Sequence, residues 1–111
     1  MPSIWVPEAF AALTADGGAD GYATVADNSK FCPGAEVFLS SDLVAGSRGI
    51  VTDLVSTNKI GVRLIKEFPL QPPSYGRSDL SAYKLADNAK ISMPGQVVPV
   101  NQPSFSKAPL L

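Results

Sequence analysis

The strongest constraint on this sequence is a series of short apolar segments between residues 34 and 66 that have the period of β-strands. Ile60, Val62 and Leu64 alternate with less apolar neighbours, so their side chains fall on one face of an extended chain. Residues 49–55 are rich in β-branched side chains, which favour strands. Polar connections that contain glycine or turn-forming residues join these segments. The pattern predicts a compact β-structure at the centre of the fold.

The rest of the chain predicts further strands, which are shorter and less regular. Gly61, inside a strand, indicates a β-bulge or a close backbone approach. Pro94 and Gly95 predict a turn, after which the last strand pairs back on the strand before it, and Pro99 confines that last strand to an edge. The predicted strands cover residues 22–25, 36–39, 49–55, 59–66, 82–85, 89–93 and 96–100.

The N-terminal residues predict a short helix. Val6, Phe10 and Leu13 follow the i, i+4, i+7 spacing of a helix face, and Pro7 suits the first helical position. A helix of about two turns is unstable alone in water, so it must pack on another surface. We therefore expect residues 1–21 to form an N-terminal arm that contains a short helix.

The C-terminal residues predict an extended tail. Residues 101–111 contain two prolines, have no periodicity and cannot build a core of their own. A proline-rich connection at residues 67–76 separates the earlier strands from the later ones. With a β-barrel domain at residues 22–100, the predicted fold is mainly β: a small barrel with a short N-terminal helix and an extended C-terminal arm.

The sequence of residues 33–65, PGAEVFLSSDLVAGSRGIVTDLVSTNKIGVRLI, resembles a small β-barrel of the KOW or Src-homology-three type. In that pattern a glycine opens a valine-rich strand, a loop follows, and a Gly-x-Val strand leads through a short turn into a strand of alternating apolar residues. The resemblance implies a strongly bent sheet, in which glycine is needed where the strands curl. The matching residues are Gly34, Val37, Leu39, Gly49, Val51, Leu54, Ile60, Val62 and Leu64.

Charged residues are scarce in this chain, which favours a role in binding other proteins. They make up 17% of the sequence, below the ~25% typical of soluble domains, and large exposed apolar areas usually mark contact sites. Small barrels with long, apolar-studded ends are similar in style to virion proteins of tailed bacteriophages, namely decoration (cement) proteins and head–tail adaptors. The expected function is that of a virion structural protein that binds major capsid or connector subunits, and self-association into a homo-oligomer is left open.

Five large apolar residues near the chain ends are the candidate partner-binding residues: Trp5, Phe10, Phe105, Leu110 and Leu111. Aromatic anchors of this kind often dominate protein interfaces. For Trp5 and Phe10, the alternative that they fold back and close the ends of the barrel is equally open.

Two other functions remain as alternatives. One is a cellular protein-binding barrel module, and the other, from a different class, is a small enzyme subunit. The N-terminus lacks the basic start and apolar core of a secretory signal, so synthesis in the host cytoplasm followed by incorporation into the virion is the expected localisation.

Catalysis, cofactor binding and metal binding are not expected. Histidine is absent, which removes the commonest general base and the commonest metal ligand together. Cys32 is the single cysteine and has no histidine to activate it. Asp16, Asp20 and Asp27 match no calcium-binding loop and suit turns instead. The chain is therefore interpreted as non-enzymatic.

Nucleic acid and membranes are not expected partners either. The net charge is −1, and no stretch of the sequence gathers lysine and arginine. Nucleic-acid binding draws most of its affinity from phosphate neutralisation, and anionic membrane surfaces attract polybasic segments. No apolar run approaches the ~18 residues of a membrane-spanning helix.

Overall fold

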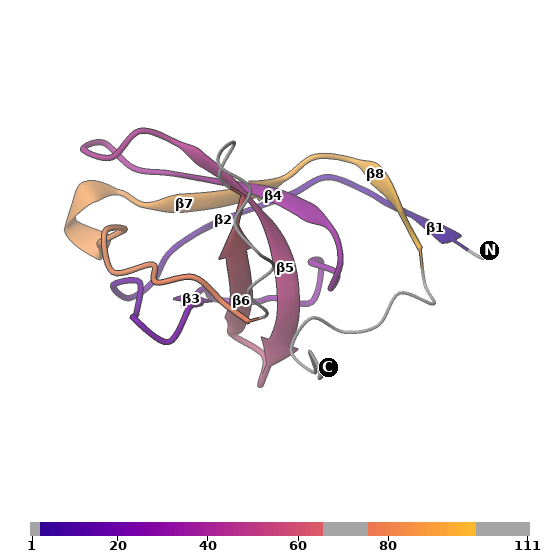
Figure 1. The fold of residues 1–111 in the computed structure, drawn as a ribbon, viewed down its shortest axis with the longest axis horizontal. Coiled ribbons are helices and arrows are strands. Elements are labelled where there is room, and N and C mark those ends of the chain that lie inside the picture. The colour runs from indigo at the N-terminus through magenta and orange to yellow at the C-terminus, as the bar shows by residue number, and fades with distance from the viewer. Residues whose placement is uncertain (1–2, 66–75, 100–111) are drawn as a thin grey trace.

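The computed structural model describes residues 3–65 and 76–99 and shows a mainly β fold (Figure 1). Six strands form one antiparallel sheet in the order β2-β7-β4-β5-β6-β3, which curls into a half-barrel, and β1 pairs with β8 in a separate two-stranded sheet. Among these residues there is no helix long and apolar enough to cross a membrane. The elements are β1 (Ser3–Val6), β2 (Ala9–Ala12), β3 (Tyr22–Thr24), β4 (Glu36–Ser40), β5 (Ser47–Val55), β6 (Lys59–Leu64), the 3-10 helix η1 (Leu85–Asp87), β7 (Lys90–Met93) and β8 (Gln96–Pro99).

The sheet curls far enough for its two edges to meet. The N–H of Thr14, just after β2, donates to the C=O of Thr24 in β3 over 2.7 Å. Beyond the end of β3, the edge of β6 is covered by Ser78. Its N–H donates to the C=O of Val62 over 2.9 Å, and its Oγ accepts from the N–H of Leu64 over 2.8 Å. These contacts satisfy backbone groups that an open sheet edge would expose.

The interior of the half-barrel is apolar and has the alternation predicted for its central strands. In β4, Val37 and Leu39 are buried, whereas Phe38 between them is exposed. In β6, Ile60 and Val62 are fully buried. The period of two therefore separates the core face from the outer face, as expected for a sheet with one buried side.

Gly61 lies opposite a β-bulge in β5, which confirms the interpretation made from the sequence. The register of β5 and β6 shifts between Val51 and Asp53, so Thr52 is the extra residue. A Cβ atom at Gly61 would lie 2.5 Å from Thr52 Oγ1 and 2.7 Å from Arg77 Cδ, and it would also meet Asp53. Glycine is required here because other side chains occupy the space.

The predicted N-terminal helix is wrong, because this segment forms β1 and β2. β2 pairs with β7, and Phe10 lies opposite Ser92. Val6 and Leu13 are both buried, and their helix-like spacing arises because the strand is interrupted at Pro7, which shifts the alternation. Pairing with β7 supplies main-chain hydrogen bonds and packing that outweigh the local helix preference of the alanines.

Two predictions in the C-terminal half are also wrong. Residues 82–85 form no strand: Ala82 lies in a turn and Leu85 begins η1. Asn88 caps the C-terminal end of η1 with a left-handed φ of 55°. β8 does not fold back on β7, because Pro94 and Gly95 kink the chain without reversing it and β8 pairs with β1. The position of Pro99 at an edge is confirmed, since β1 is the one strand that pairs with β8 in the described part of the chain.

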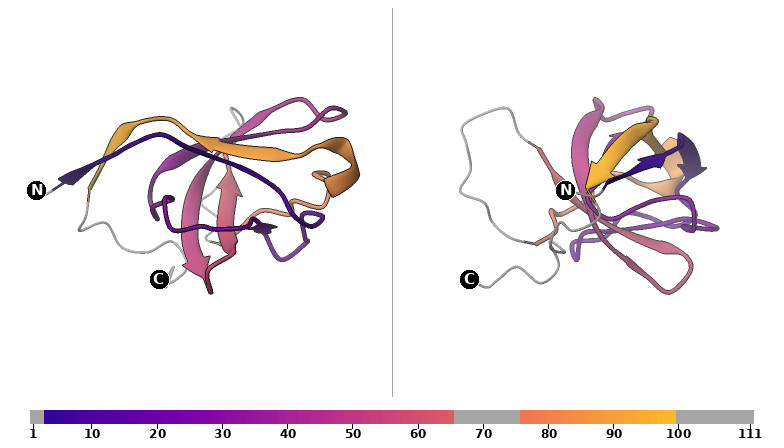
Figure 2. Two further views of the ribbon diagram at one scale, coloured as in Figure 1. Left: turned by 180° about the vertical axis from the view of Figure 1, so that it is seen from behind. Right: turned by 90° about the vertical axis from the view of Figure 1, so that its right-hand side faces the viewer.

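β1 and β8 project from one end of the half-barrel (Figures 1 and 2), and we call this two-stranded sheet the arm. Within the described ranges, each of the two strands pairs with the other and with no further strand. The predicted connection at residues 67–76, except Gly76, and the predicted C-terminal arm at residues 101–111 lie outside the described residues.

Substitution of Gly61 by alanine is expected to lower the free energy of unfolding by about 1 to 3 kcal/mol, because the new methyl group overfills a packed site. Urea denaturation followed by circular dichroism measures the change. Gly18→Ala is the matched control, because a Cβ atom there would meet mainly the flexible side chain of Asp20. Equal destabilisation by both substitutions would contradict the packing argument.

Candidate partner-binding surface

The two faces of the arm differ in exposure. Val6 and Val98 are buried and belong to the hydrophobic core cluster. Trp5 and Val97 lie opposite each other on the two strands and are 65% and 61% exposed. The arm therefore carries one face that packs on the rest of the described fold, which we call the body. Its other face is apolar and is left uncovered by the described residues.

Trp5 lies across the kink of the neighbouring strand. A Cβ atom at Gly95 would be 2.8 Å from Cζ2 and 2.9 Å from Cη2 of the indole. The missing side chain lets the ring approach the backbone at the kink while most of its surface stays in solvent. A ring held in this way loses less conformational freedom on binding, which favours affinity.

A groove on the outer face of β2, β7 and β4 continues this apolar surface. Phe10 lies opposite Ser92, which lies opposite Phe38, so two aromatic rings flank one small side chain. Phe10 is 65% exposed and Phe38 is 43% exposed. The groove has a volume of about 690 Å³. Its lining consists of Glu8, Ala9, Phe10, Lys30, Phe38, Ser92, Met93 and Pro94.

Two of the five candidate residues from the sequence, Trp5 and Phe10, lie on this surface. Both are largely in solvent, so neither folds back to close an end of the barrel. Phe105, Leu110 and Leu111 lie outside the described residues. The surface is thus built from the paired ends of the described chain and the outer sheet face beside them.

Sequence reasoning missed Phe38 and Val97. Phe38 lies between Val37 and Leu39 in β4. Because side chains alternate between the two faces of a strand, burial of these two neighbours indicates that the ring of Phe38 lies on the outer face. Val97 had no such signal. Its position opposite Trp5 depends on the β1–β8 register, and the sequence interpretation paired β8 with β7 instead.

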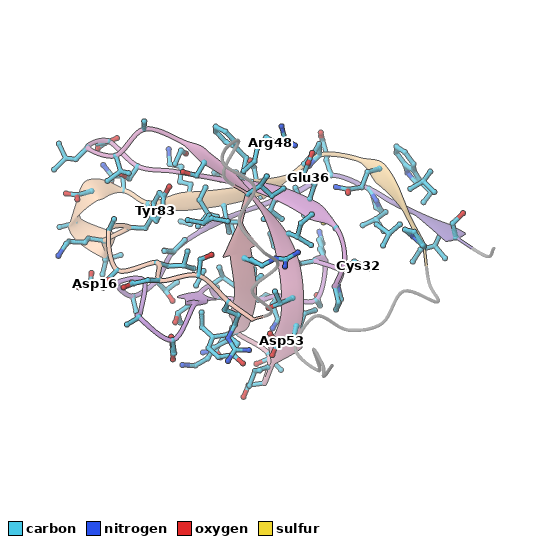
Figure 3. All side chains as sticks on the ribbon, viewed as in Figure 1. Asp16, Cys32, Glu36, Arg48, Asp53 and Tyr83 are labelled. Carbon is cyan, nitrogen blue, oxygen red and sulfur yellow. The ribbon has the colours of Figure 1, made fainter. Side chains whose placement is uncertain are left out.

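Gln96 fixes the base of the arm to the body. Its side-chain amide accepts from the N–H of Glu36 over 2.8 Å and donates to the C=O of Glu36 over 3.0 Å. The amide thereby satisfies the backbone N–H and C=O of Glu36 at the start of β4, which is what a neighbouring strand would otherwise do. The carboxylate of Glu36 forms an exposed ion pair with Arg48 at 2.8 Å (Figure 3), and such exposed pairs add little to stability.

A polar cluster surrounds Asp53 beside the bulge. Its carboxylate accepts hydrogen bonds from the hydroxyls of Tyr22 and Thr52, each over 2.8 Å. Arg77 lies 3.3 Å from this carboxylate and places its guanidinium 4.2 Å from the centre of the Tyr22 ring. Burial raises the pKa of the Tyr22 hydroxyl above its ordinary value, and the hydrogen bond to Asp53 raises it further. These groups bind one another, so we interpret the cluster as a clamp that holds residues 76–80 on the barrel.

The residues considered for metal binding and for nucleophilic chemistry take part in turns and packing. Asp16 accepts a hydrogen bond from a backbone N–H in η1, and Asp20 and Asp27 each accept one from the amide two residues on. Cys32 is half-buried, and burial raises the pKa of its thiol, which lowers the fraction of reactive thiolate. Asp16, Cys32 and Asp53 come from separate parts of the molecule (Figure 3), and in the described part of the chain no three possible metal ligands gather.

Replacing Tyr22 by phenylalanine is expected to flatten the loss of stability at alkaline pH. Because the folded pKa of Tyr22 is raised, its contribution is complete below the unfolded value of about 10 and is lost as the pH rises through the higher folded pKa. Urea denaturation between roughly pH 8 and 11 measures this dependence. Parallel pH profiles of the wild-type chain and Tyr22→Phe would rule the argument out.

Comparison with protein-family models, with curated proteins and with solved structures finds no match for this chain. The arrangement of the described side chains is therefore the basis for assigning a function. That arrangement offers an apolar surface along the arm and the outer sheet face, whereas the polar groups around Asp53 bind one another.

Proposed function

We propose that this protein is a non-enzymatic structural protein of a virion, which binds capsid or connector subunits through its ends and so stabilises or decorates the particle. The observation that carries this proposal is the exposed apolar face of the arm, where Trp5 lies opposite Val97. The same surface extends over Phe10 and Phe38 on the sheet.

The energetics of this surface favour a binding role. Burying a large apolar side chain stabilises a complex by about 1.5 to 3 kcal/mol, and tryptophan is among the residues most often found at the energetic centre of interfaces. A two-stranded sheet is at best marginally stable in water by itself. An arm that consists of two short strands and presents Trp5 to solvent is therefore suited to contact a further surface.

The assignment to a virion rests on the overall character of the chain. The molecule combines a small curled sheet, low charge content and long apolar ends. In a symmetric shell the same contact recurs many times, so each copy needs only modest affinity for the assembly to be stable. The curled antiparallel sheet, with Gly61 at a bulge, also supports the finer proposal of a KOW or Src-homology-three type of barrel.

A cellular protein-binding barrel module is the second candidate, and it would use the same surface. Capsid, portal and tail genes beside the gene for this chain favour the virion, whereas ribosomal or transcription genes favour the cellular module. An enzyme subunit is the weakest candidate, because the Asp53 cluster is occupied by its own members.

The Trp5→Ser substitution is expected to lower incorporation of the chain into particles at least about tenfold, because loss of the buried indole costs more than ~1.4 kcal/mol per contact. Particles are purified by density gradient from host cells that make the chain together with the capsid and connector proteins encoded beside it, and the bound chain is quantified by immunoblotting.

Leu43→Ser is the matched control, since Leu43 is 77% exposed but lies in the β4–β5 connection, away from the arm. It should be incorporated like the wild-type chain. Absence of the wild-type chain from particles would overturn the virion assignment. An equal loss with Leu43→Ser would overturn the role of the arm.

A further inference from the structure

The outer edge of β1 has the properties of an edge that accepts another strand. In the described chain, β8 is its one strand neighbour. Natural proteins protect edge strands with charges, prolines or bulges, but residues 3–6 read Ser-Ile-Trp-Val and contain no such device. The outer edge of β8, by contrast, carries Pro99. Of the two edges of the arm, β1 is therefore the open one.

The register of the arm shows which main-chain groups point outward from β1. Ser3 lies opposite Pro99, and proline has no N–H, so this pair does not exchange two hydrogen bonds. Paired residues of an antiparallel ladder alternate between the hydrogen-bonded and the non-hydrogen-bonded type. The N–H and C=O groups of Ser3 and Trp5 therefore point away from β8, and together they offer two donors and two acceptors along one edge.

We infer that β1 pairs antiparallel with β1 of a second copy of this chain, across a two-fold axis that passes between the two Ile4 residues. In this register Ser3 of each copy lies opposite Trp5 of the other, and the two outward-facing residues exchange both hydrogen bonds. The pairing joins the two arms into one four-stranded sheet in the order β8-β1-β1-β8. This inference goes beyond the proposed function, because it concerns how the chain binds itself.

The side chains on the arm favour a second copy as the occupant. No charged residue occurs in residues 3–6 or 96–99, so self-pairing brings no like charges together, whereas a charged partner strand would find no opposite charge. Ile4 is 45% exposed and meets its symmetry mate on the two-fold axis. Each Trp5 stands beside Ser3 of the other copy, a side chain small enough to leave room for the indole.

The two-fold pairing also has consequences for stability and for binding. Sheets of three or more strands reach independent stability, which a two-stranded sheet lacks. An isologous contact closes on itself and produces a dimer rather than a fibre. Three residues of each β1, Ser3, Ile4 and Trp5, pair in this register. The contact is smaller than a standard interface, so we expect a dimer that dissociates on dilution. The dimer places the two Trp5 faces on one side of the joined sheet, where both can contact the same partner.

A disulfide trap tests the pairing. Two residues that face each other as a non-hydrogen-bonded pair have Cα atoms about 4.5 Å apart, within the span of a disulfide. The full chain with Cys32→Ala and Ile4→Cys is oxidised, and covalent dimer is quantified on a non-reducing gel. We expect dimer to form at least tenfold faster than in the matched control with Cys32→Ala and Ser3→Cys, whose new cysteines are offset by two residues in the proposed register.

A second variant tests the hydrogen bonds themselves. Ser3→Pro, added to the Ile4→Cys chain, removes one outward N–H and leaves the pairs of Ile4 and Val6 with β8 in place, so it should reduce cross-linking to the level of the Ser3→Cys control. An unchanged urea midpoint shows that the variant is folded.

Equal cross-linking of the Ile4→Cys and Ser3→Cys chains would overturn the inference, as would cross-linking that survives Ser3→Pro. If either occurs while Trp5→Ser still blocks incorporation into particles, the edge does not pair with a second copy and the proposed function stands. A covalent link from Ile4→Cys to a particle protein alone would likewise exclude self-pairing.

Discussion

The pairing of the first described strands with the last ones is the contact on which the rest of the molecule depends. β2 lies against β7 and β1 against β8, so residues 78 to 96 positions apart in the sequence pair in two successive ladders on either side of the kink. These ladders supply the edge strand that curls round to Thr24 and closes the half-barrel. They also carry the chain past the kink and outward as the arm. Long-range pairing of this kind costs loop-closure entropy and is stabilised only when both strands are in place.

The sequence predicted the part of the fold in which local pattern and tertiary packing agree. In β4 and β6 the alternation of apolar residues coincides with burial, and Gly61 is explained by the crowding around the bulge. The N-terminal segment was mispredicted because alanines and a chance spacing of Val6, Phe10 and Leu13 favour a helix locally, whereas the strand is imposed by β7 from the other end of the chain. The same limitation hid Val97, since a register between distant strands leaves no signal in either strand alone.

The distribution of polar groups separates structural from functional surface. Asp53 is bound by Tyr22, Thr52 and Arg77, and this cluster secures the chain that returns after β6. The side-chain amide of Gln96 forms hydrogen bonds with the backbone of β4 at the base of the arm. In each case the donors and acceptors meet within the chain. The largest exposed side chains on the arm and the sheet face beside it, Trp5, Phe10 and Phe38, are aromatic. Such groups recognise other proteins through shape and burial.

The body and the arm, which meet at the kink, differ in structure and in the role that this structure suits. The body carries most of the buried core, and its two outer strands meet at the Thr14–Thr24 hydrogen bond. The arm has one face in the core, an open edge at β1 and Trp5 in solvent, so contacts outside the chain add to its stability. Because Gly95 and Gln96 hold the arm at its base, less order has to be imposed when a partner arrives, and more of the burial energy remains as affinity. A scaffold with a partly ordered, uncharged arm is thus physically suited to join an assembly whose other members complete its sheet.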